Sequence, residues 1–394
     1  METTVDIVIV GGGIAGLATS LGLHRLGLQS LVLESSESLR VTGFALTLWT
    51  NAWRALDALG IADSLRQHSL PITDQFMSIS CCFRNLECRC LRRKLLLETL
   101  EKELPQGTVR YSSKVVLIEE SGPYKLVHLA DGSLVRTKVL IGCDGVNSVV
   151  AKWLGLQKPV DSKRADIRGF VEYPEKHGFE PKFYLLVGDR VHFGFLPCDD
   201  NGVYWFYNFA PSIAHFDQSA QKDPVKLKEF VLSKIKNAPK EVKGVVERTP
   251  LDSISCAGLK LRLPWNVLLG DIVRNNICVA GDALHPMTPD IGQGGCSALE
   301  DSVILARKLG EALLLKSGDE ELRRIRYGLD RYAKERRCRS FLLITCAYLI
   351  GSIQASDNRV VSFLRDNFLA KYTLVIVLGM ADFDCGKLLS SRSR

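Results

Sequence analysis

The sequence predicts an α/β fold: a Rossmann-like dinucleotide-binding domain with an inserted antiparallel β-sheet domain and a C-terminal helical region. A β-branched run at residues 5–10, interrupted only by Asp6, is typical of a strand that is buried on both faces of a parallel sheet. Three glycines follow it, and a helical pattern then leads to a second short strand at residues 31–34. Aromatic runs that alternate with polar turns fill residues 161–261, which favours an antiparallel sheet. From Ser297 onwards the pattern is helical.

Composition and charge are typical of a soluble globular protein. The 394 residues are 46% hydrophobic and 24% charged, and this length suits two domains. Part of the net charge of +7 lies in basic runs such as residues 334–339, which we interpret as a solvated helix face, so we expect no nucleic-acid partner. The longest apolar stretches, residues 341–353 and 372–380, are shorter than the roughly 20 residues that cross a bilayer. We expect no membrane span, and peripheral membrane contact stays open.

The start of the chain and its cysteines bear on the compartment. The first strand begins near residue 5, which leaves no room for a signal or transit peptide, and the 12 cysteines are scattered. We therefore expect free thiols, a cytoplasmic location with a plastid as the alternative, and a monomer or homodimer. Cys81, Cys82, Cys88 and Cys90 raise the question of a zinc site. They lack the two-residue spacer of common zinc ligands, so we interpret them as alternating strand residues and expect no metal.

The first motif is the glycine-rich turn after the opening strand. It consists of Gly11, Gly12, Gly13, Ile14, Ala15 and Gly16. In this spacing the first glycine permits a tight turn, the second lets a pyrophosphate approach the backbone, and the third lets the helix pack closely. The amides at the helix start would face the phosphates. Glu34 ends the next strand, where an acidic residue accepts hydrogen bonds from a ribose, so the unit predicts an adenine dinucleotide rather than an ordinary turn.

Two further motifs follow later strands. Residues 108–119 and 125–129 predict antiparallel strands, which lead to a buried strand at 135–142 and then to Asp144-Gly145, a pair that is also common in simple turns. Asp282 follows a fourth buried strand at 277–280, and a proline-stiffened loop leads from it to a glycine-rich helix start. That start comprises Gly292, Gln293, Gly294 and Gly295. Its unpaired amides and positive dipole suit a ring carbonyl or a developing anion.

In this order and spacing, the three motifs resemble those of FAD-dependent aromatic hydroxylases built like p-hydroxybenzoate and salicylate hydroxylase. The similarity covers about residues 5–340 and is strongest to the plant branch of salicylate-hydroxylase-like monooxygenases, which also resembles zeaxanthin epoxidase. We therefore expect an FAD-binding domain made of residues 1–160 and 262–340. The antiparallel-sheet substrate domain would be residues 161–261, and a C-terminal helical tail would be residues 341–394.

The resemblance implies roles for the matching residues. The glycines at positions 11, 13 and 16 would hold the FAD pyrophosphate, and Glu34 the adenosine ribose. Arg93 matches an arginine that contacts FAD, with Arg92 as a near-equal candidate one position away. Arg40 lies where the family often has a basic residue just before an FAD-contacting glycine loop, here residues 42–44.

Other matching residues lie near the predicted flavin ring. Asp144 and Gly145 would serve FAD and NAD(P)H together, and Asp282 would bind the ribityl chain. Pro289 and residues 292–295 would line the isoalloxazine ring. The chain departs from the family pattern at Ala151 and Lys152, where an arginine is usual, and at Cys296, where many relatives carry asparagine. Whether these departures reduce activity stays open.

The resemblance implies an FAD- and NAD(P)H-dependent monooxygenase that inserts one oxygen atom from O2 through a flavin C4a-hydroperoxide. Its substrate would be a hydrophobic small molecule, aromatic or isoprenoid-like. The sequence has no second dinucleotide fingerprint, which fits an enzyme that binds the nicotinamide only transiently. The alternatives are a flavin-dependent reductase or cyclase, and a non-catalytic flavin-binding or escort-like protein with the same fold.

Candidate catalytic residues come from the flavin loop and from the inserted strands. His285 lies beside the flavin loop, where it either takes part in catalysis or braces the Asp282 loop. Pro289 lies further along the same loop. On the inserted strands the candidates that would meet the substrate are Arg168, His192, Tyr204 and Tyr207. Because side chains alternate along a strand, half of the aromatic residues there must face the protein core.

Overall fold

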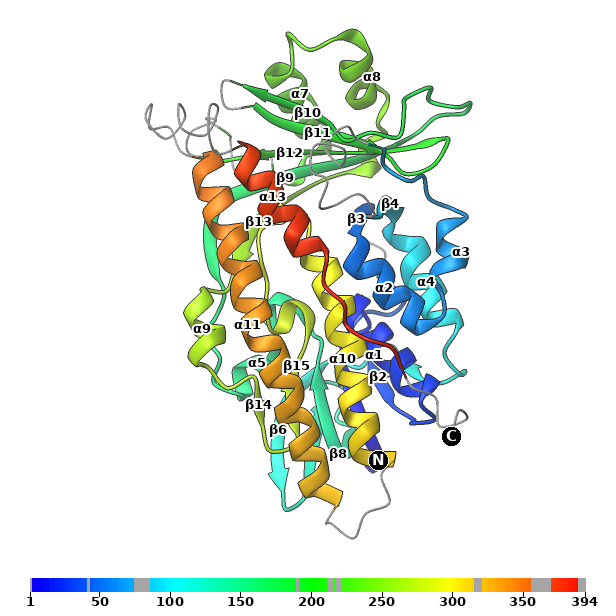
Figure 1. Ribbon diagram of the computed structural model, residues 1–394, viewed down its shortest axis with the longest axis vertical. Helices are drawn as coiled ribbons and strands as arrows, with labels where there is room; N and C mark the ends of the chain where they lie inside the picture. Colours follow the sequence, from blue (N-terminus) through cyan, green and yellow to red (C-terminus); the bar gives the residue numbers. More distant parts are fainter. Residues whose placement is uncertain are drawn as a thin grey trace.

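Two β-sheets form the framework of the protein and lie toward opposite ends of the molecule (Figure 1). The computed structural model describes residues 2–40, 43–73, 86–188, 191–211, 216, 221–314, 321–355 and 370–388. A mainly parallel sheet lies near the N-terminus. Two long helices, α10 (Gly294–Leu314) and α11 (Glu321–Ala355), extend from it toward the antiparallel sheet (Figure 1). This arrangement confirms the predicted α/β fold with an inserted antiparallel sheet and C-terminal helices.

The parallel sheet has the strand order β14-β15-β8-β1-β2-β5. These strands are β1 (Glu2–Val10), β2 (Leu31–Leu33), β5 (Val109–Arg110), β8 (Leu134–Gly142), β14 (Val273–Arg274) and β15 (Ile277–Val279). The edge strand β14 is antiparallel to β15, and the other neighbours pair in parallel. β1 lies between β8 and β2, and its residues 7–10 are buried, which explains their continuous apolar run. The carboxyl ends of β1, β8 and β15 therefore bring all three sequence motifs to one edge.

The segment at residues 108–119 is not the single strand that its sequence predicts. β5 ends at Arg110 and pairs with β2, whereas β6 (Val115–Ser121) begins after a break. Ser112 lies in that break with a φ of +53°, a left-handed conformation that interrupts an extended strand. The predicted antiparallel pairing holds for β6 and β7 (Tyr124–Leu129), and β7 in turn pairs with β8.

Helices and a small two-stranded antiparallel sheet cover the parallel sheet. The helices are α1 (Ile14–Arg25), α2 (Thr50–Leu59), α3 (Ala62–Arg66), α4 (Arg93–Lys102), α5 (Val149–Trp153) and α9 (Pro264–Leu269), and the small sheet pairs β3 (Ala45–Trp49) with β4 (Cys88–Arg92). Cys88 and Cys90 are buried on β4, which confirms their interpretation as alternating strand residues. Cys81 and Cys82 lie outside the described residues. Within the described ranges, no group of three or more His, Cys, Asp or Glu side chains is placed to hold a metal ion.

The antiparallel sheet has two contrasting faces. Its order is β10-β11-β12-β9-β13. The strands are β9 (Val160–Glu172), β10 (Tyr184–Gly188), β11 (Val191–Pro197), β12 (Gly202–Phe209) and β13 (Ile254–Leu261). One face packs on α7 (Pro224–Lys234) and α8 (Lys240–Arg248) through an aromatic core that includes Phe193, Trp205 and Tyr207. The alternate residues, such as Arg168 and Phe206, therefore face the parallel-sheet part of the molecule.

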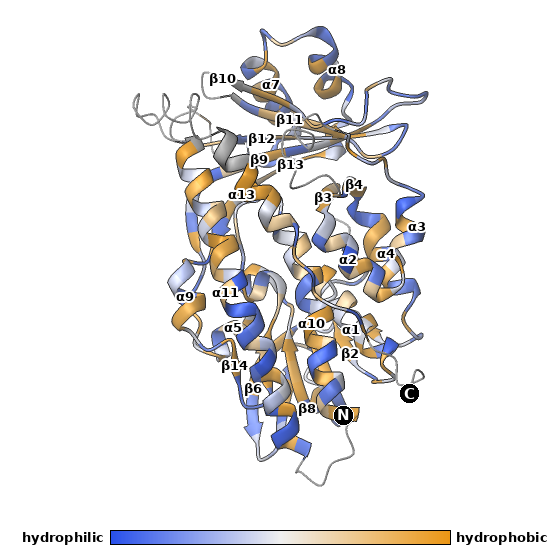
Figure 2. Ribbon diagram, in the orientation of Figure 1, coloured by the Kyte–Doolittle hydropathy of each residue, from blue (hydrophilic) through white to orange (hydrophobic). Residues whose placement is uncertain are grey.

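The C-terminal region differs from the predicted separate tail. α11 is one continuous helix from Glu321 to Ala355, so the predicted boundary at residues 340 and 341 falls inside it. The apolar stretch 341–353 is the second half of this helix, and α13 (Ala370–Ala381) lies near it. Both segments are largely hydrophobic (Figure 2). No helix in the described ranges is long and apolar enough to cross a membrane.

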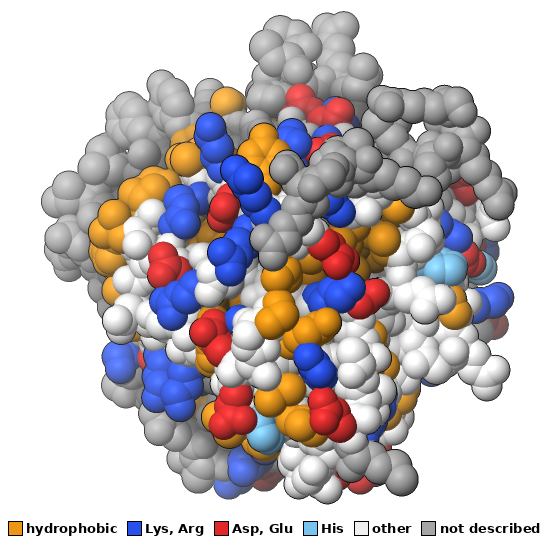
Figure 3. Space-filling model, turned by 90° about the horizontal axis from the view of Figure 1, so that it is seen from below, with side chains coloured by type: hydrophobic (Ala, Val, Ile, Leu, Met, Phe, Trp, Pro, Cys, Tyr) orange, Lys and Arg blue, Asp and Glu red, His pale blue; other side chains and the backbone are white. Residues whose placement is uncertain are grey.

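The net charge of +7 is the small excess of 51 Lys and Arg over 44 Asp and Glu residues. Figure 3 shows the end of the molecule that lies at the bottom of Figure 1, and there Lys and Arg stand among Asp, Glu and apolar side chains. On this face, opposite charges lie close enough to weaken one another's field.

Candidate active site

A cavity of about 860 Å³ lies between the carboxyl ends of the parallel strands and the inner face of the antiparallel sheet. It brings together most of the predicted site residues. Those that line it are Gly11, Gly13, Ile14, Ala15, Glu34, Arg40, Arg93, Asp144, Gly145, Arg168, Asp282, Pro289, Gly292, Gly294 and Gly295. His192 and Tyr204 also line it, whereas the predicted candidates outside its lining are Gly16, Arg92, Tyr207, His285 and Gln293.

The glycines of the first turn are required for different structural reasons. Gly11 has a φ of +103°, and a Cβ on it would lie 2.4 Å from the Cys143 carbonyl oxygen. A Cβ on Gly16 would lie 1.9 Å from the carbonyl oxygen of Gly11, so this glycine lets α1 approach the turn. A Cβ on Gly13 would meet no atom within 4 Å, because this position opens on the cavity. Gly13 thus keeps space free for a bound group.

Glu34 is fixed at the end of β2 by backbone amides. Its Oε2 accepts a hydrogen bond of 2.6 Å from the Gly12 N–H, and its Oε1 accepts one of 2.9 Å from the Ser36 N–H. Burial alone would raise the pKa of Glu34, but these amides and the charge of Arg40 hold it below the ordinary value. The carboxylate is therefore ionised at neutral pH, and its remaining lone pairs can accept ribose hydroxyls.

The structure separates the two arginine candidates. Arg93 begins α4 and faces the cavity, and its buried Nε has no hydrogen-bond partner among the described residues. Burial lowers the pKa of Arg93, and the nearby Asp282 carboxylate acts in the opposite direction. Arg92 instead donates to Asp199 at 2.6 Å and to Glu172 at 2.9 Å, which ties β4 to the antiparallel sheet. Arg93 is thus the arginine with a nitrogen left to donate in the cavity.

Two carboxylates stand at the ends of neighbouring strands. Asp144 follows β8 and accepts hydrogen bonds from the Ser148 hydroxyl at 2.5 Å and the Val149 N–H at 2.7 Å. Burial raises the pKa of Asp144, against the effect of these donors. Asp282 follows β15, and its side chain is exposed on the cavity. Ala151 is buried and Lys152 is exposed outside the cavity lining, so neither departure reaches this edge.

The start of α10 presents backbone to the cavity. A Cβ on Gly294 would meet nothing within 4 Å, and Gly292 has a φ of +60° with the Trp49 indole close by. The side chain of Gln293 points away from the cavity, and its Oε1 accepts a 2.8 Å hydrogen bond from the Asn51 amide, so at this position only the backbone is available to line the ring. Cys296 is also buried away from the cavity, and burial raises its pKa to about 12.

The comparisons with known proteins agree with this geometry. Residues 4–345 match the model of the FAD binding domain family. Monooxygenase 2 of Arabidopsis thaliana is 50% identical over 98% of this chain and 99% of its own length. Monooxygenase 1 of the same plant is 36% identical over 98% and 99%. The chain belongs to the FAD-dependent monooxygenases. The predicted relationship to plant members of this group is thereby confirmed.

Solved structures show the same fold at low sequence identity. Klebsiella pneumoniae HpxO, complexed with FAD and uric acid, superposes with a TM-score of 0.78 at 20% identity and covers 97% of this chain and 96% of its own. A 2-methyl-3-hydroxypyridine-5-carboxylic acid oxygenase has a TM-score of 0.71 at 19% identity, with 98% and 97% covered.

The cavity of this FAD-dependent monooxygenase fits its cofactor by independent observations. Two glycine positions, Gly13 and Gly294, open on it without a neighbouring atom. The buried Nε of Arg93 lacks a partner in the described part of the chain, and Glu34 offers an ionised carboxylate. Such unpaired donors and acceptors around a narrow space suit the phosphates, hydroxyls and ring of FAD.

His285 lies behind the cavity wall rather than in it. Its imidazole is fully buried, and its Nε2 lies 2.7 Å from Oδ2 of Asp301. The same Oδ2 accepts a 2.7 Å hydrogen bond from the Gly281 N–H. Of the two roles expected for His285, this geometry argues against the catalytic one and favours bracing of the loop that carries Asp282, because Asp301 on α10 contacts both the loop and the imidazole.

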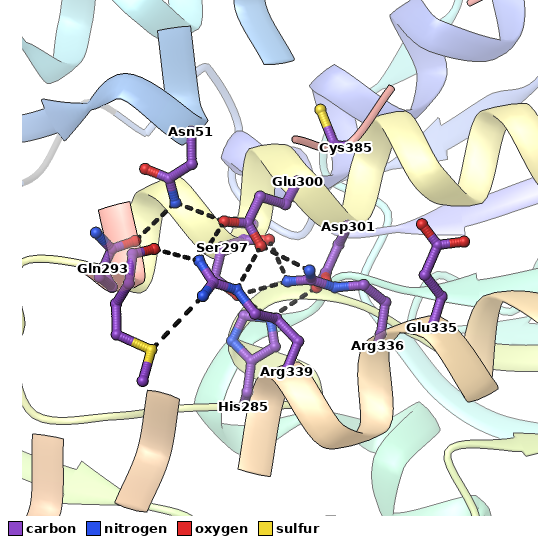
Figure 4. Close-up of polar contacts among 12 residues, drawn as sticks. Asn51, His285, Gln293, Ser297, Glu300, Asp301, Glu335, Arg336, Arg339 and Cys385 are labelled. Atoms are coloured by element: carbon purple, nitrogen blue, oxygen red, sulfur yellow. Dashed lines mark hydrogen bonds and ion pairs between the residues drawn. The ribbon is translucent and has the colours of Figure 1, made fainter. Parts of the chain in front are cut away.

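A buried ion cluster holds this region together (Figure 4). Arg336 on α11 donates to Asp301 at 2.5 Å and to Glu300 at 2.6 Å, and all three side chains are fully buried. Arg339 adds a 2.8 Å contact to Glu300, and Asn51 on α2 donates to the same carboxylate. Burial opposes ionisation, yet the opposite charges keep the pKa of both carboxyls low and that of Arg336 high. The expectation that residues 334–339 form a solvated face is thus wrong for these two arginines.

Several cavity residues are absent from the sequence-based prediction. They include Thr47 and Trp49 on β3, Asp166 and Asn208 on the antiparallel sheet, and Val377 on α13. Alternation along β9 and β12 is the one signal that could have indicated the polar pair, since Asp166 shares a face with Arg168.

We predict that Gly13→Val weakens cofactor binding while leaving the fold intact. Gly13 has a φ of −84°, which any residue adopts, and the new side chain would meet cavity rather than protein. We expect FAD affinity to fall by at least about tenfold, measured by flavin fluorescence titration. Gly244→Val on the surface helix α8, where a Cβ also meets nothing, is the matched control. An unchanged affinity in Gly13→Val would contradict the placement of the pyrophosphate.

We predict that Arg336→Met destabilises the protein by about 3–5 kcal/mol, because Arg339 alone then faces the two buried carboxylates of Glu300 and Asp301 and one negative charge stays uncompensated. Denaturant unfolding of the FAD-free protein measures this loss. The control on the same helix is Arg331→Met, which breaks the exposed pair with Glu311 and an exposed contact with the Tyr327 ring and should cost less than about 1 kcal/mol. Equal losses of unfolding free energy in the two variants would show that the buried cluster contributes no more to stability than the exposed pair.

Proposed function

We propose that this chain is an FAD- and NAD(P)H-dependent monooxygenase that inserts one oxygen atom from O2 into a small, flat ring compound. The observation that carries the proposal is the continuity of one cavity. It extends from Glu34 and Gly13, which suit the adenosine and pyrophosphate, to the aromatic face of the antiparallel sheet. A ring compound can therefore lie against the same space that holds the flavin.

In this proposal, the chain binds the cofactor mainly with backbone and strand-end residues. Glu34 accepts the ribose hydroxyls, and the turn at residues 11–16 holds the pyrophosphate. Arg93 and Asp282 contact the chain between phosphate and ring. Pro289 and the backbone of residues 292–295 lie along the ring, where the N-terminal end of α10 stabilises negative charge.

The ring end of the cavity is closed by contacts between distant elements. Arg164 on β9 and Asp290 form a two-bonded ion pair of 2.7 and 2.9 Å, which holds the loop after Pro289 against the antiparallel sheet. Val377 brings α13 into the wall. These contacts restrict the access of water and fix the spacing between the flavin ring and the antiparallel sheet, as oxygen transfer requires.

Bound FAD would supply the electron transfer and oxygen activation, with NAD(P)H as the reductant. The sequence has no second dinucleotide fingerprint, which supports a nicotinamide that binds only briefly, with Asp144 and Gly145 at its approach. Pro289 and Arg168 would orient the reacting ring. The cytoplasmic location and the monomeric or homodimeric state stay predictions.

The relatives support a small ring substrate. A urate hydroxylase of Mycolicibacterium vanbaalenii is 25% identical over 76% of this chain. The similar HpxO structure contains uric acid, and the pyridine carboxylic acid oxygenase is named for a substituted six-membered ring. The aromatic residues Phe183, Tyr204 and Phe206 on the inner face of the sheet suit a flat compound of this size.

Isotope labelling tests the proposal. The FAD-loaded protein is incubated under ¹⁸O₂ with NADH or NADPH and a panel of hydroxylated and heteroaromatic rings. We expect a ring compound that accelerates both NAD(P)H oxidation and oxygen consumption, and a product that gains one ¹⁸O atom by mass spectrometry. Reduction of a panel compound without oxygen consumption would instead indicate a reductase. An absence of NAD(P)H oxidation with every compound would favour a non-catalytic flavin-binding protein.

A further inference from the structure

A row of polar side chains crosses the inner face of the antiparallel sheet. Asp166 on β9 and Asn208 on β12 are direct cross-strand partners. Arg168 lies two residues along β9 from Asp166 and therefore on the same face. All three side chains line the cavity. This polar row stands among aromatic residues, where a purely hydrophobic substrate would gain nothing from it.

The acceptor atoms of the row are incompletely bonded. Asp166 accepts a hydrogen bond from Nε of Arg168 through Oδ2, but its Oδ1 has no partner in the described ranges. Oδ1 of Asn208 also lacks one there. Asp166 is only 2% exposed and Asn208 9% exposed, so bulk water does not reach these oxygens freely. Buried acceptors are almost always bonded in proteins, which makes a ligand the natural source of the missing donor.

The carboxylate of Asp166 decides the chemistry. Burial raises the pKa of Asp166, but the ion pair with Arg168 opposes this shift and favours the ionised form, which can only accept hydrogen bonds. An amide such as Asn208 can present either its oxygen or its nitrogen, since the two ends can exchange. Arg168 supplies hydrogen-bond donors. Its Nε is used by Asp166, its side chain is 31% exposed, and its terminal nitrogens have no partner among the described residues. An acceptor and a donor therefore stand side by side at the cavity.

The surroundings limit the shape of what can bind. The rings of Phe183 and Phe206 lie 6.1 Å apart between centroids, and Tyr204 packs 6.2 Å from Phe206. These rings form an apolar wall beside the polar row. The neighbouring ion pair between Arg164 and Asp290 differs from the pair of Arg168 and Asp166, since both carboxylate oxygens of Asp290 are bonded. The charges of Asp166 and Arg168 cancel. The row therefore selects a ligand by the arrangement of its hydrogen-bond donors and acceptors more than by its net charge.

We propose that this row selects flat ring compounds whose edge carries an N–H or O–H donor next to an acceptor oxygen. The donor bonds Oδ1 of Asp166, with Asn208 beside it, and the oxygen accepts from Arg168. This inference rests on the proposed function and names the substrate class of the same site. It also replaces the expected plain hydrophobic substrate with one that has a polar edge.

Equilibrium binding tests the proposal without turnover. The oxidised, FAD-loaded protein is titrated in the absence of NAD(P)H, and the change in flavin absorbance or fluorescence reports binding. The probes are matched pairs: quinolin-2-one and its N-methyl derivative, and 3-hydroxy-2-naphthoic acid and its methyl ether. We expect the donor-bearing member of at least one pair to bind about tenfold or more tightly than its methylated partner, as the loss of a hydrogen bond to a charged group implies.

Variants then assign the preference to the row. Asp166→Asn should lower the ratio between donor-bearing and methylated probes, because a neutral amide oxygen accepts more weakly than a carboxylate, and Asn208→Leu should lower it in the same direction. Asp199→Asn is the matched control, because Asp199 also pairs with an arginine, Arg92, but lies outside this cavity. Bound FAD per chain and melting temperature check folding, and the binding ratio itself does not depend on the amount of folded protein.

The outcomes separate this inference from the proposed function. Equal binding of methylated and donor-bearing probes, or no binding by any donor-bearing probe, would overturn it. A ratio that survives both Asp166→Asn and Asn208→Leu would overturn it as well. Selective binding together with a complete lack of oxygen insertion would support the site and contradict the monooxygenase proposal.

Discussion

The site depends on the contact between Asp301 and Arg336. Asp301 accepts from Arg336 with one oxygen, and with the other it accepts from the Gly281 amide and meets His285. One carboxylate thus joins α11, α10 and the loop that carries Asp282. Because the cluster of Glu300, Asp301 and Arg336 is fully buried, loss of the charge on Asp301 or Arg336 leaves it with an unbalanced charge. The loop and helix start that face the cavity are held in place by charges that never touch it.

This constraint extends through neighbouring contacts to both ends of the cavity. Glu300, next to Asp301, meets Arg339 and Asn51, and Asn51 also fixes Gln293 at the start of α10. Arg339 donates to the Met380 carbonyl, which anchors α13, the helix that supplies Val377 to the wall. The C-terminal region is therefore part of the cofactor site rather than a detached tail.

Local sequence determines one part of this site and distant contacts determine the other. The glycine turn, Glu34 and the strand ends at Asp144 and Asp282 were predictable, because each is fixed by a buried strand and the turn that follows it. His285 and Gln293 were not, since their directions are set by Asp301 and Asn51 on other helices. Position in the sequence places such residues near the cavity but does not show which way they point.

The burial of Arg336 was within reach of the sequence, although its partners were not. Arg336 continues the buried stripe of α11 that includes Leu329, Tyr332 and Leu343, at helical spacing. A charge in that stripe must meet an opposite charge, and the adjacent pair Glu300-Asp301 lies on another helix. Nothing in one sequence identifies that partner, just as nothing in it shows which oxygens of Asp166 and Asn208 stay unbonded.

A structure of the protein with FAD and a donor-bearing ring compound tests the central claim most directly. The account predicts the adenosine ribose at Glu34 and the flavin ring along residues 292–295. It places the ligand between that ring and the antiparallel sheet, with its donor within hydrogen-bond distance of Asp166 Oδ1. Flavin density over the Asp166 row itself, or a ligand bound outside the cavity, would contradict the account.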